Sequence, residues 1–241
     1  MDFKKMVLWG AAVMALASGC VMPQKKDDRS MLPKVCFTLD DGFEEHYLMV
    51  APILEKYGFR GTFNVIVDRI GAKGYMTWDQ LRDLNRRGHA IENHTMTHPN
   101  LVELAKAGKK DELTREIAYS AERIATEIGR RPTLLCHPYA ATNRQVDECI
   151  RDAWLVPMNP HRCNFGEGTV PGSENGAGAF IRKSIDQNRR CIDLLTHGVT
   201  KEGPAWRPFP SVDVFEQHVK EVRKLYDTRV VDVVLYRDAC R

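Results

Sequence analysis

The chain has 241 residues, of which 43% are hydrophobic and 28% are charged, and its formal net charge at pH 7 is +3. This composition excludes a disordered chain and is sufficient for the core of one α/β domain. Because the Lys and Arg residues are scattered along the chain, the small positive charge gives no argument for binding to nucleic acid.

An apolar run close to the N-terminus predicts an export signal. The run from Met6 to Ala17 follows two lysines, is too short to cross a bilayer as a mature helix, and has the length of a signal-peptide core. It ends in Ala17-Ser-Gly-Cys20, which resembles the lipobox of bacterial lipoproteins. The resemblance implies a signal peptide over 1–19, a lipid anchor on Cys20, a tether over 20–33, and a place in the cell envelope that faces the periplasm or the cell surface. Ordinary secretion and an uncleaved anchor are the alternatives.

Apolar periodicity and turn residues predict strands and helices that alternate along the rest of the chain. The predicted strands occupy 34–39, 61–67, 89–92, 133–136, 191–196 and 229–235. The predicted helices occupy 44–57, 77–87, 111–128, 144–153 and 211–226. Thr77 with Gln80 has the pattern of a capping box, and the segment 157–178, rich in Gly, Pro and Asn, is interpreted as a long loop over the site. The alternation indicates a single α/β domain over 34–241, with parallel strands and outer helices.

Several polar clusters directly follow predicted strands. They are Asp40-Asp41, Asn93 to His98, His137 to Tyr139, and His197. Since the carboxyl ends of strands in a parallel barrel meet on one face, we expect these clusters to converge there.

The spacing of two histidines favours a metal site. His94 and His98 are four residues apart, so one helical turn would place both imidazoles on the same side. Two imidazoles and one carboxylate form a common catalytic zinc set with a position open for water, whose pKa can fall to about 7. Asp40 and Asp41 point to opposite sides if the backbone is extended, so one can hold the metal while the other acts as a base. Taken alone, two histidines at this spacing are more often surface or core residues than metal ligands.

The motifs resemble those of the polysaccharide deacetylase family. Phe37-Thr-Leu-Asp-Asp-Gly42 is similar to the first motif, in which Phe usually stands at the position of Leu39. His94-Thr-Met-Thr-His98 is similar to the second motif, and Leu195-Thr-His197 to the last. The resemblance runs from about Val35 to Tyr236 and implies a distorted (β/α) barrel that removes acetyl groups from a glycan.

The resemblance also implies a role for each matching residue. Asp41, His94 and His98 would hold a divalent metal, most favourably zinc, with cobalt or nickel as alternatives. Asp40 would be the general base. His197 would be the general acid, and the backbone N–H of Tyr139 would donate to the oxyanion. The implied partner is an acetylated polysaccharide or oligosaccharide.

The third motif departs from the family pattern. Many members have Arg-x-Pro-Tyr-Gly, whereas this chain has Cys136-His-Pro-Tyr-Ala140, as in a subgroup of the family that also lacks the Arg. Asp40 therefore lacks its usual partner, and Arg162 and Arg182 are the candidates to replace it. Cys136 itself is interpreted as a small buried residue, with a redox-sensitive thiol as the alternative.

The remaining polar residues carry weaker signals. Asp152-Ala-Trp154 is the nearest match to a fourth motif, and a helix surface followed by a core Trp is the alternative interpretation. His137 is interpreted as a pocket wall. Four histidines without motif support are interpreted as surface or structural, namely His46, His89, His161 and His218. Six cysteines allow up to three disulfides in 15 connectivities or buried free thiols, namely Cys36, Cys136, Cys149, Cys163, Cys191 and Cys240.

Several functions stay open at this point. Hydrolysis of N-acetyl groups on a chitin-like or peptidoglycan-like chain is favoured, and removal of O-acetyl groups from xylan uses the same kind of site. A non-haem iron oxygenase also uses two histidines and a carboxylate, but here the carboxylate comes first and from a strand turn. A glycan-binding protein with eroded catalysis and a small-molecule amidase are further alternatives.

Overall fold

The computed structural model describes residues 28–158, 163–164, 169–199 and 210–239. The predicted signal peptide, Cys20, His161 and Arg162 lie outside these ranges. None of the described helices combines the length and the apolar character needed to cross a bilayer.

Parallel strands form one curved sheet. The strands are β1 Lys34–Leu39, β2 Gly61–Val65, β3 Ala90–Asn93, β4 Leu134–Leu135, β5 Val156–Pro157, β6 Cys163–Asn164, β7 Cys191–Thr196 and β8 Asp232–Val233. Their order is β5-β4-β3-β2-β1-β7-β6, with β8 paired to the start of β1. Every pairing between these strands is parallel. Within the described residues the sheet is thus a half-barrel, which confirms the predicted fold class.

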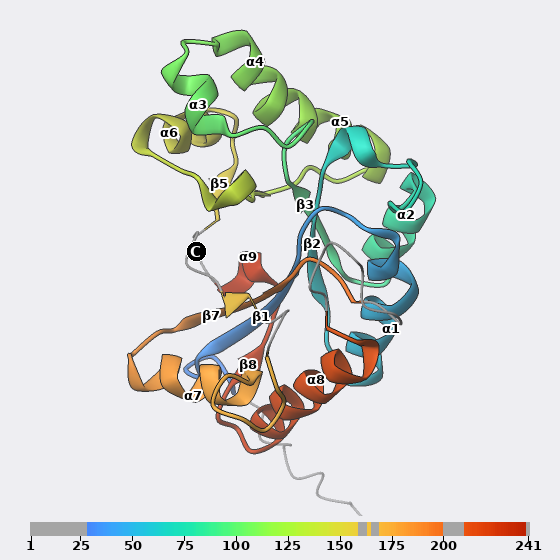
Figure 1. Cartoon of the computed structure of the whole chain (residues 1–241), viewed down its shortest axis with the longest axis vertical. Helices are drawn as coiled ribbons and strands as arrows, with labels where there is room; N and C mark the ends of the chain where they lie inside the picture. Colours follow the sequence, from blue (N-terminus) through green and yellow to red (C-terminus); the bar gives the residue numbers. More distant parts are fainter. Residues whose placement is uncertain (1–27, 159–162, 165–168, 200–209, 240–241) are drawn as a thin grey trace, which may run out of the picture.

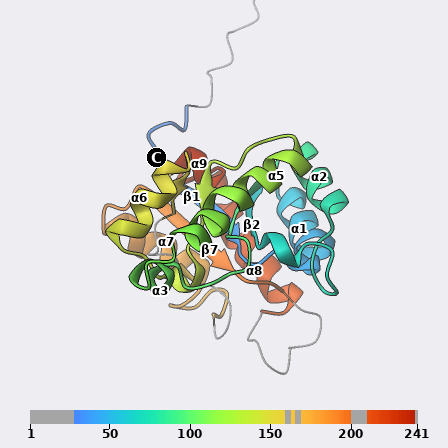
Figure 2. The same cartoon turned by 90° about the horizontal axis from the view of Figure 1, so that it is seen from above.

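Helices surround the sheet. They are α1 Ala51–Lys56, α2 Trp78–Arg86, α3 Leu101–Lys106, α4 Lys110–Thr114, α5 Ser120–Ile128, α6 Arg144–Asp152, α7 Ala177–Asp186, α8 Val212–Asp227 and α9 Tyr236–Ala239. Figure 1 shows the sheet in the centre of the molecule, with α1, α2 and α5 along one side of it and α7 and α8 at one end. Seen from above, α3 and α6 lie on the opposite side from α1 and α2 (Figure 2).

Two helical segments contain a wider turn. The π-helix η1 His46–Val50 directly precedes α1, and the π-helix η3 Arg115–Tyr119 joins α4 to α5. Short 3₁₀ segments, η2 Val67–Arg69 and η4 Pro138–Ala140, follow β2 and β4. The predicted helices 44–57 and 111–128 are therefore each formed as a continuous helical run with a local widening.

The core lies on both sides of the sheet's curve. β1 and β2 are buried along almost their whole length, as expected for central parallel strands covered by helices. The main apolar cluster joins these strands to α1, α2, α7 and α8, and a second cluster joins α3, η3 and α6. A small third cluster, which includes Cys36, Cys136 and Tyr236, packs α9 against β1 and β4. Packing in these three clusters fixes the positions of the central strands and therefore of their carboxyl ends.

The structure differs from the predicted elements at several places. The helices α3, α7 and α9 were not predicted, and β6 lies inside the segment 157–178 that was interpreted as a loop. β2 ends at Val65, and β4 and β8 have only 2 residues each, shorter than the predicted strands. By contrast, β1 and β7 have the predicted bounds, and α2 has the predicted capping box between Thr77 and Gln80.

Candidate metal centre

Three side chains from two distant segments meet at the carboxyl end of the sheet. Asp41 follows β1, and His94 and His98 follow β3. The Oδ1 atom of Asp41 lies 3.6 Å from Nε2 of His94 and 3.7 Å from Nε2 of His98. One ligand atom from each of the three residues lies within 4.8 Å of the other two, and Asp41 and His94 are buried. This spacing allows one cation to contact all three atoms.

A backbone carbonyl determines the tautomer of His94. Nδ1 of His94 lies 2.8 Å from the carbonyl oxygen of Cys136. A carbonyl only accepts, so Nδ1 carries the proton and Nε2 presents its lone pair toward Asp41. The ring is therefore oriented and protonated as a metal ligand requires.

The segment from His94 to His98 is an irregular loop, which corrects the predicted helical turn. Thr95 and His98 both have φ of 69°, in the left-handed region, so the chain doubles back without a helix. The side chain of Asn93 accepts from the N–H of Thr95, and the hydroxyl of Thr95 accepts from the N–H of His98. The two imidazole centroids end 4.7 Å apart. The histidines meet because these local hydrogen bonds fold the loop.

Glu116 holds the same loop from outside. Its carboxylate, which is buried, accepts from the backbone N–H and from the hydroxyl of Thr97, both at 2.8 Å. Asn93 in turn donates to the carbonyl of Ile117 and to Ser120, so the loop is attached to the η3–α5 helical run. Sequence reasoning missed Asn93 and Glu116 as supports. The available signal for Asn93 was its place at the start of the polar cluster that runs to His98.

The two adjacent aspartates diverge, although the reason differs from the prediction. Asp41 has φ of 78° and Gly42 has φ of 83°, so Asp41 lies in a left-handed turn and not in extended backbone. Gly42 also approaches β2 closely, because a Cβ at this position would lie 3.3 Å from Cγ1 of Val65. The turn directs Asp41 to the histidines, whereas Asp40 contacts Asn64 and Cys136.

Two arginines were the candidates to stand beside Asp40. Arg182 lies exposed on α7, and Arg162 lies outside the described residues. Asp40 is buried, as is Cys136, in agreement with the interpretation of Cys136 as a small buried residue. The thiol of Cys136 lies 3.4 Å from Oδ2 of Asp40, so this residue also contacts the predicted base.

His197 follows β7 and is held through its backbone. Nε2 of His46 donates to the carbonyl oxygen of His197 at 2.9 Å. His46 is fully buried, and this burial lowers its pKa to about 4, so its ring is neutral near pH 7. His46 is therefore structural, as predicted. His197 is close enough to His98 for a positive charge on one ring to disfavour a positive charge on the other.

Tyr139 lies beside His98 at the surface. Its ring centroid is 4.7 Å from that of His98, and its side chain is 69% exposed. Tyr139 has φ of 60° inside η4, and in the described part of the chain no acceptor pairs with its backbone N–H.

The pKa of His98 is lowered to about 4, first by burial and then by the neighbouring His94. This shift keeps the imidazole of His98 neutral near pH 7, with a lone pair to donate.

The residues present fit a divalent cation. The cluster offers one carboxylate oxygen and two imidazole nitrogens, the donor set that zinc and its neighbours in the first transition series prefer. The carboxylate supplies negative charge in a buried place, where an unpaired carboxylate would be unfavourable.

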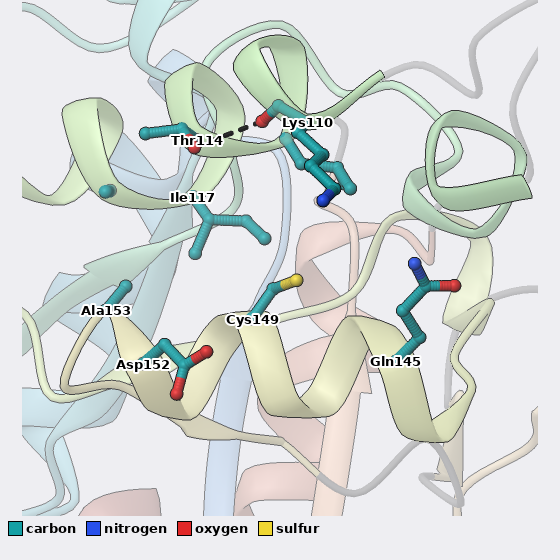
Figure 3. Close-up of a pocket in the computed structure, with 9 residues that line it drawn as sticks. Lys110, Thr114, Ile117, Gln145, Cys149, Asp152 and Ala153 are labelled. Carbon is teal, nitrogen blue, oxygen red and sulfur yellow. Dashed lines mark hydrogen bonds between the residues drawn. The ribbon is translucent and has the colours of Figure 1, made fainter. Parts of the chain in front are cut away.

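Other predicted residues lie elsewhere. Nε2 of the buried His137 lies 3.0 Å from Asp147, which attaches the loop after β4 to α6. Trp154 is 87% exposed, so its interpretation as a core Trp is wrong. Asp152 is exposed on α6, at one end of a separate cavity of about 330 Å³. Figure 3 shows this cavity between α6 and the α4–η3 run, with the Cys149 sulfur pointing into it.

The cysteines divide into free and bonded groups. Cys36, Cys136 and Cys149 are free thiols, and Cys191 is disulfide-bonded to a residue outside the described side chains. His89 and His218 are buried, in agreement with their interpretation as structural.

The fold and the cluster together define a β/α half-barrel protein with an Asp–His–His group at the carboxyl ends of its strands. A family model described as polysaccharide deacetylase matches residues 28–156, which is more than half of the chain. The chain belongs to the polysaccharide deacetylase family.

Individual relatives agree with this family. YxkH of Bacillus subtilis (strain 168), named for the same family, is 29% identical over 111 residues, which cover 46% of this chain and 38% of that protein. The chain spans between 38% and 57% of the length of the curated relatives that it matches.

Solved structures share the fold. A family 4 acetyl xylan esterase from Clostridium thermocellum, in complex with a cobalt ion, has a TM-score of 0.62 and 20% identity, covering 85% of this chain and 89% of that one. The Bc1960 peptidoglycan N-acetylglucosamine deacetylase has a TM-score of 0.62 and 18% identity, covering 87% of this chain and 88% of that one. At this level of identity the likeness shows the architecture.

Proposed function

We propose that the chain is a metal-dependent hydrolase that removes acetyl groups from a carbohydrate polymer, with N-acetyl groups favoured over O-acetyl groups. The observation that carries the proposal is the meeting of Asp41 Oδ1 with Nε2 of His94 and of His98, at 3.6 Å and 3.7 Å. Membership of the polysaccharide deacetylase family supports the reaction class. The curated relatives named as chitin and chitooligosaccharide deacetylases favour the N-acetyl substrate.

Asp41, His94 and His98 would hold the cation, with zinc favoured and cobalt or nickel as alternatives. When bound, a divalent cation polarises a carbonyl and lowers the pKa of water. The neutral state of His98 and the Nε2 lone pair of His94 prepare both rings for this role. The buried carboxylate of Asp41 compensates part of the positive charge.

The other residues would handle protons and the oxyanion. Asp40, held apart from Asp41 by the turn, accepts the proton of the attacking water as general base. The backbone N–H of Tyr139 donates to the oxygen of the tetrahedral adduct, a contribution of roughly 10²–10³ in rate for such donors. His197 donates a proton to the leaving amine, which a neutral leaving group requires.

Acetate release tests the proposal together with metal content. Purified protein is stripped with a chelator, reloaded with zinc, cobalt or nickel, and incubated with chito-oligosaccharides, peptidoglycan fragments and acetylated xylan. We expect acetate only from the reloaded protein. Asp41→Ala and His94→Ala should lose bound zinc and activity together, whereas Asp40→Asn should keep zinc and lose at least about 10²-fold in kcat. Full activity after chelation contradicts the proposal, and tight glycan binding without acetate release supports an eroded binding protein instead.

We also propose that the chain is exported and anchored through Cys20, with residues 1–19 as signal peptide, 20–33 as tether and 34–241 as catalytic domain. The support is the apolar run that ends in Ala17-Ser-Gly-Cys20. Cys20→Ser should move the protein from the membrane fraction to the soluble fraction of the envelope. Unchanged membrane association of that variant would exclude the lipid anchor.

A further inference from the structure

Two neutral donors contact the two oxygens of the Asp40 carboxylate. Nδ2 of Asn64 donates to Oδ1 at 2.7 Å, and the thiol of Cys136 lies 3.4 Å from Oδ2. All three side chains are buried, with exposed fractions of 2% or less. The donors come from separate strands, because Asn64 lies on β2 and Cys136 directly follows β4.

We propose that Asn64 and Cys136 are positioning residues that fix the orientation of the Asp40 carboxylate, in place of the arginine that many family members have at the position of Cys136. The inference rests on the proposed function, in which Asp40 is the base. A carboxylate on a single side chain can rotate about two bonds. One donor on each oxygen restrains both rotations.

The polarity of Asn64 is difficult to explain by packing alone. It lies between Phe63 and Val65 on β2, whose residues are all buried. A buried amide is unfavourable unless its polar atoms are paired, yet within the described residues Oδ1 of Asn64 has no hydrogen-bond partner. A reversed amide would bring two oxygens to 2.7 Å. With Asp40 as the proposed base, its oxygens only accept and select the observed orientation, and within the described residues this is the one hydrogen bond of the amide.

Cys136 connects the predicted base to a predicted metal ligand. Its thiol contacts Asp40, and its carbonyl oxygen accepts from Nδ1 of His94 at 2.8 Å. Its own N–H donates to the carbonyl of Asn93 at 2.8 Å, which fixes its backbone at the end of β3. One residue thus sets the relative positions of the base and of His94, and the side chain alone determines the contact to the base.

Steady-state kinetics of the zinc-loaded enzyme test this inference, with the best acetylated glycan of the panel above as substrate. Asn64→Leu should lower kcat about 10-fold or more, and Cys136→Ala about 5-fold, because the base then samples unproductive orientations. KM and the zinc affinity should stay within about twofold of the native values, since neither residue is a ligand. Cys136→Ser, which restores a donor at the same position, should recover most of the kcat lost in Cys136→Ala.

Thr62→Val is the matched control. Thr62 is buried on the same strand, two residues before Asn64, so its side chain points to the same face, but its hydroxyl accepts from the N–H of Tyr236 and does not contact Asp40. A merely structural role for Asn64 would make Asn64→Leu resemble this control, with a lower Tm and an unchanged kcat.

The outcomes separate this inference from the proposed function. A native enzyme that releases no acetate with any metal overturns the proposed function and the inference together. Two results overturn the inference alone. One is a kcat equal to that of the native enzyme in both Asn64→Leu and Cys136→Ala. The other is a fractional loss of bound zinc in these variants that equals their fractional loss of kcat. If Asn64→Leu does not fold, the pair Cys136→Ala and Cys136→Ser, which differ by one donor, decides the question.

Discussion

At the scale of single residues, unusual backbone angles produce the candidate metal centre. Asp41, Thr95 and His98 all have positive φ, which is unfavourable for residues other than glycine. Surrounding hydrogen bonds stabilise these angles, above all those of Asn93 and Glu116 in the loop after β3. The cluster is therefore preorganised by residues that are not ligands themselves.

Removal of the Glu116 carboxylate should loosen this loop. We expect Glu116→Ala to weaken zinc binding about 10- to 100-fold, as is common for residues that orient metal ligands, because Thr97 loses both of its acceptors. A competition titration with a chelating dye measures the affinity.

Glu112→Ala provides the matched control for this variant. Glu112 lies one turn earlier in the same helical run, is exposed, and pairs with Lys109. Equal zinc affinities in the two variants would show that Glu116 does not support the site.

The identities of the candidate site residues could be predicted from the sequence, but their geometry could not. The order and spacing of motifs indicated Asp41, His94 and His98, and the parallel topology predicted that they would converge. A helical turn was nevertheless the wrong explanation for the histidine pair, because spacing alone cannot distinguish a helix from a loop closed by Asn93 and Thr95. Asn64 was missed, although an Asn between two apolar residues of a predicted strand is a usable signal.

At the scale of elements, segments with clear apolar patterns and caps were predicted well, and segments without them were not. β1, β7, α2 and α8 follow from apolar runs bounded by clear caps, such as Ser211, whose side chain accepts from the N–H of Val214. α3 has only 6 residues, too few for a clear period, whereas α7 has 10 residues but is preceded by Gly176, an N-cap without a side-chain acceptor. The π segments η1 and η3 are also invisible to a period of 3.6 residues.

At the scale of the whole molecule, buried histidines link the stability of the fold to pH. Burial lowers the pKa of His46 to about 4 and also lowers the pKa of His89 and of His218 below the ordinary value of 6.5. Each of these rings is hydrogen-bonded in its buried position. Nδ1 of His218 accepts from the N–H of Ala177 at the start of α7, and Nε2 of His46 donates to the carbonyl of His197 after β7.

Acid should therefore destabilise the metal-free protein in a defined range. Below pH 6.5 the unfolded chain binds protons that the folded protein does not, so the free energy of unfolding falls as the pH is lowered from about 6.5 toward 4, and it is independent of these histidines above that range. His46 alone should contribute about 3 kcal/mol over this interval, or up to about 1.4 kcal/mol per pH unit. Urea unfolding between pH 4.5 and 8 should show a shallower dependence for His46→Gln, which keeps a donor for His197 but does not titrate. Parallel curves for the native protein and the variant would mean that His46 is protonated as easily in the folded state as in the unfolded chain.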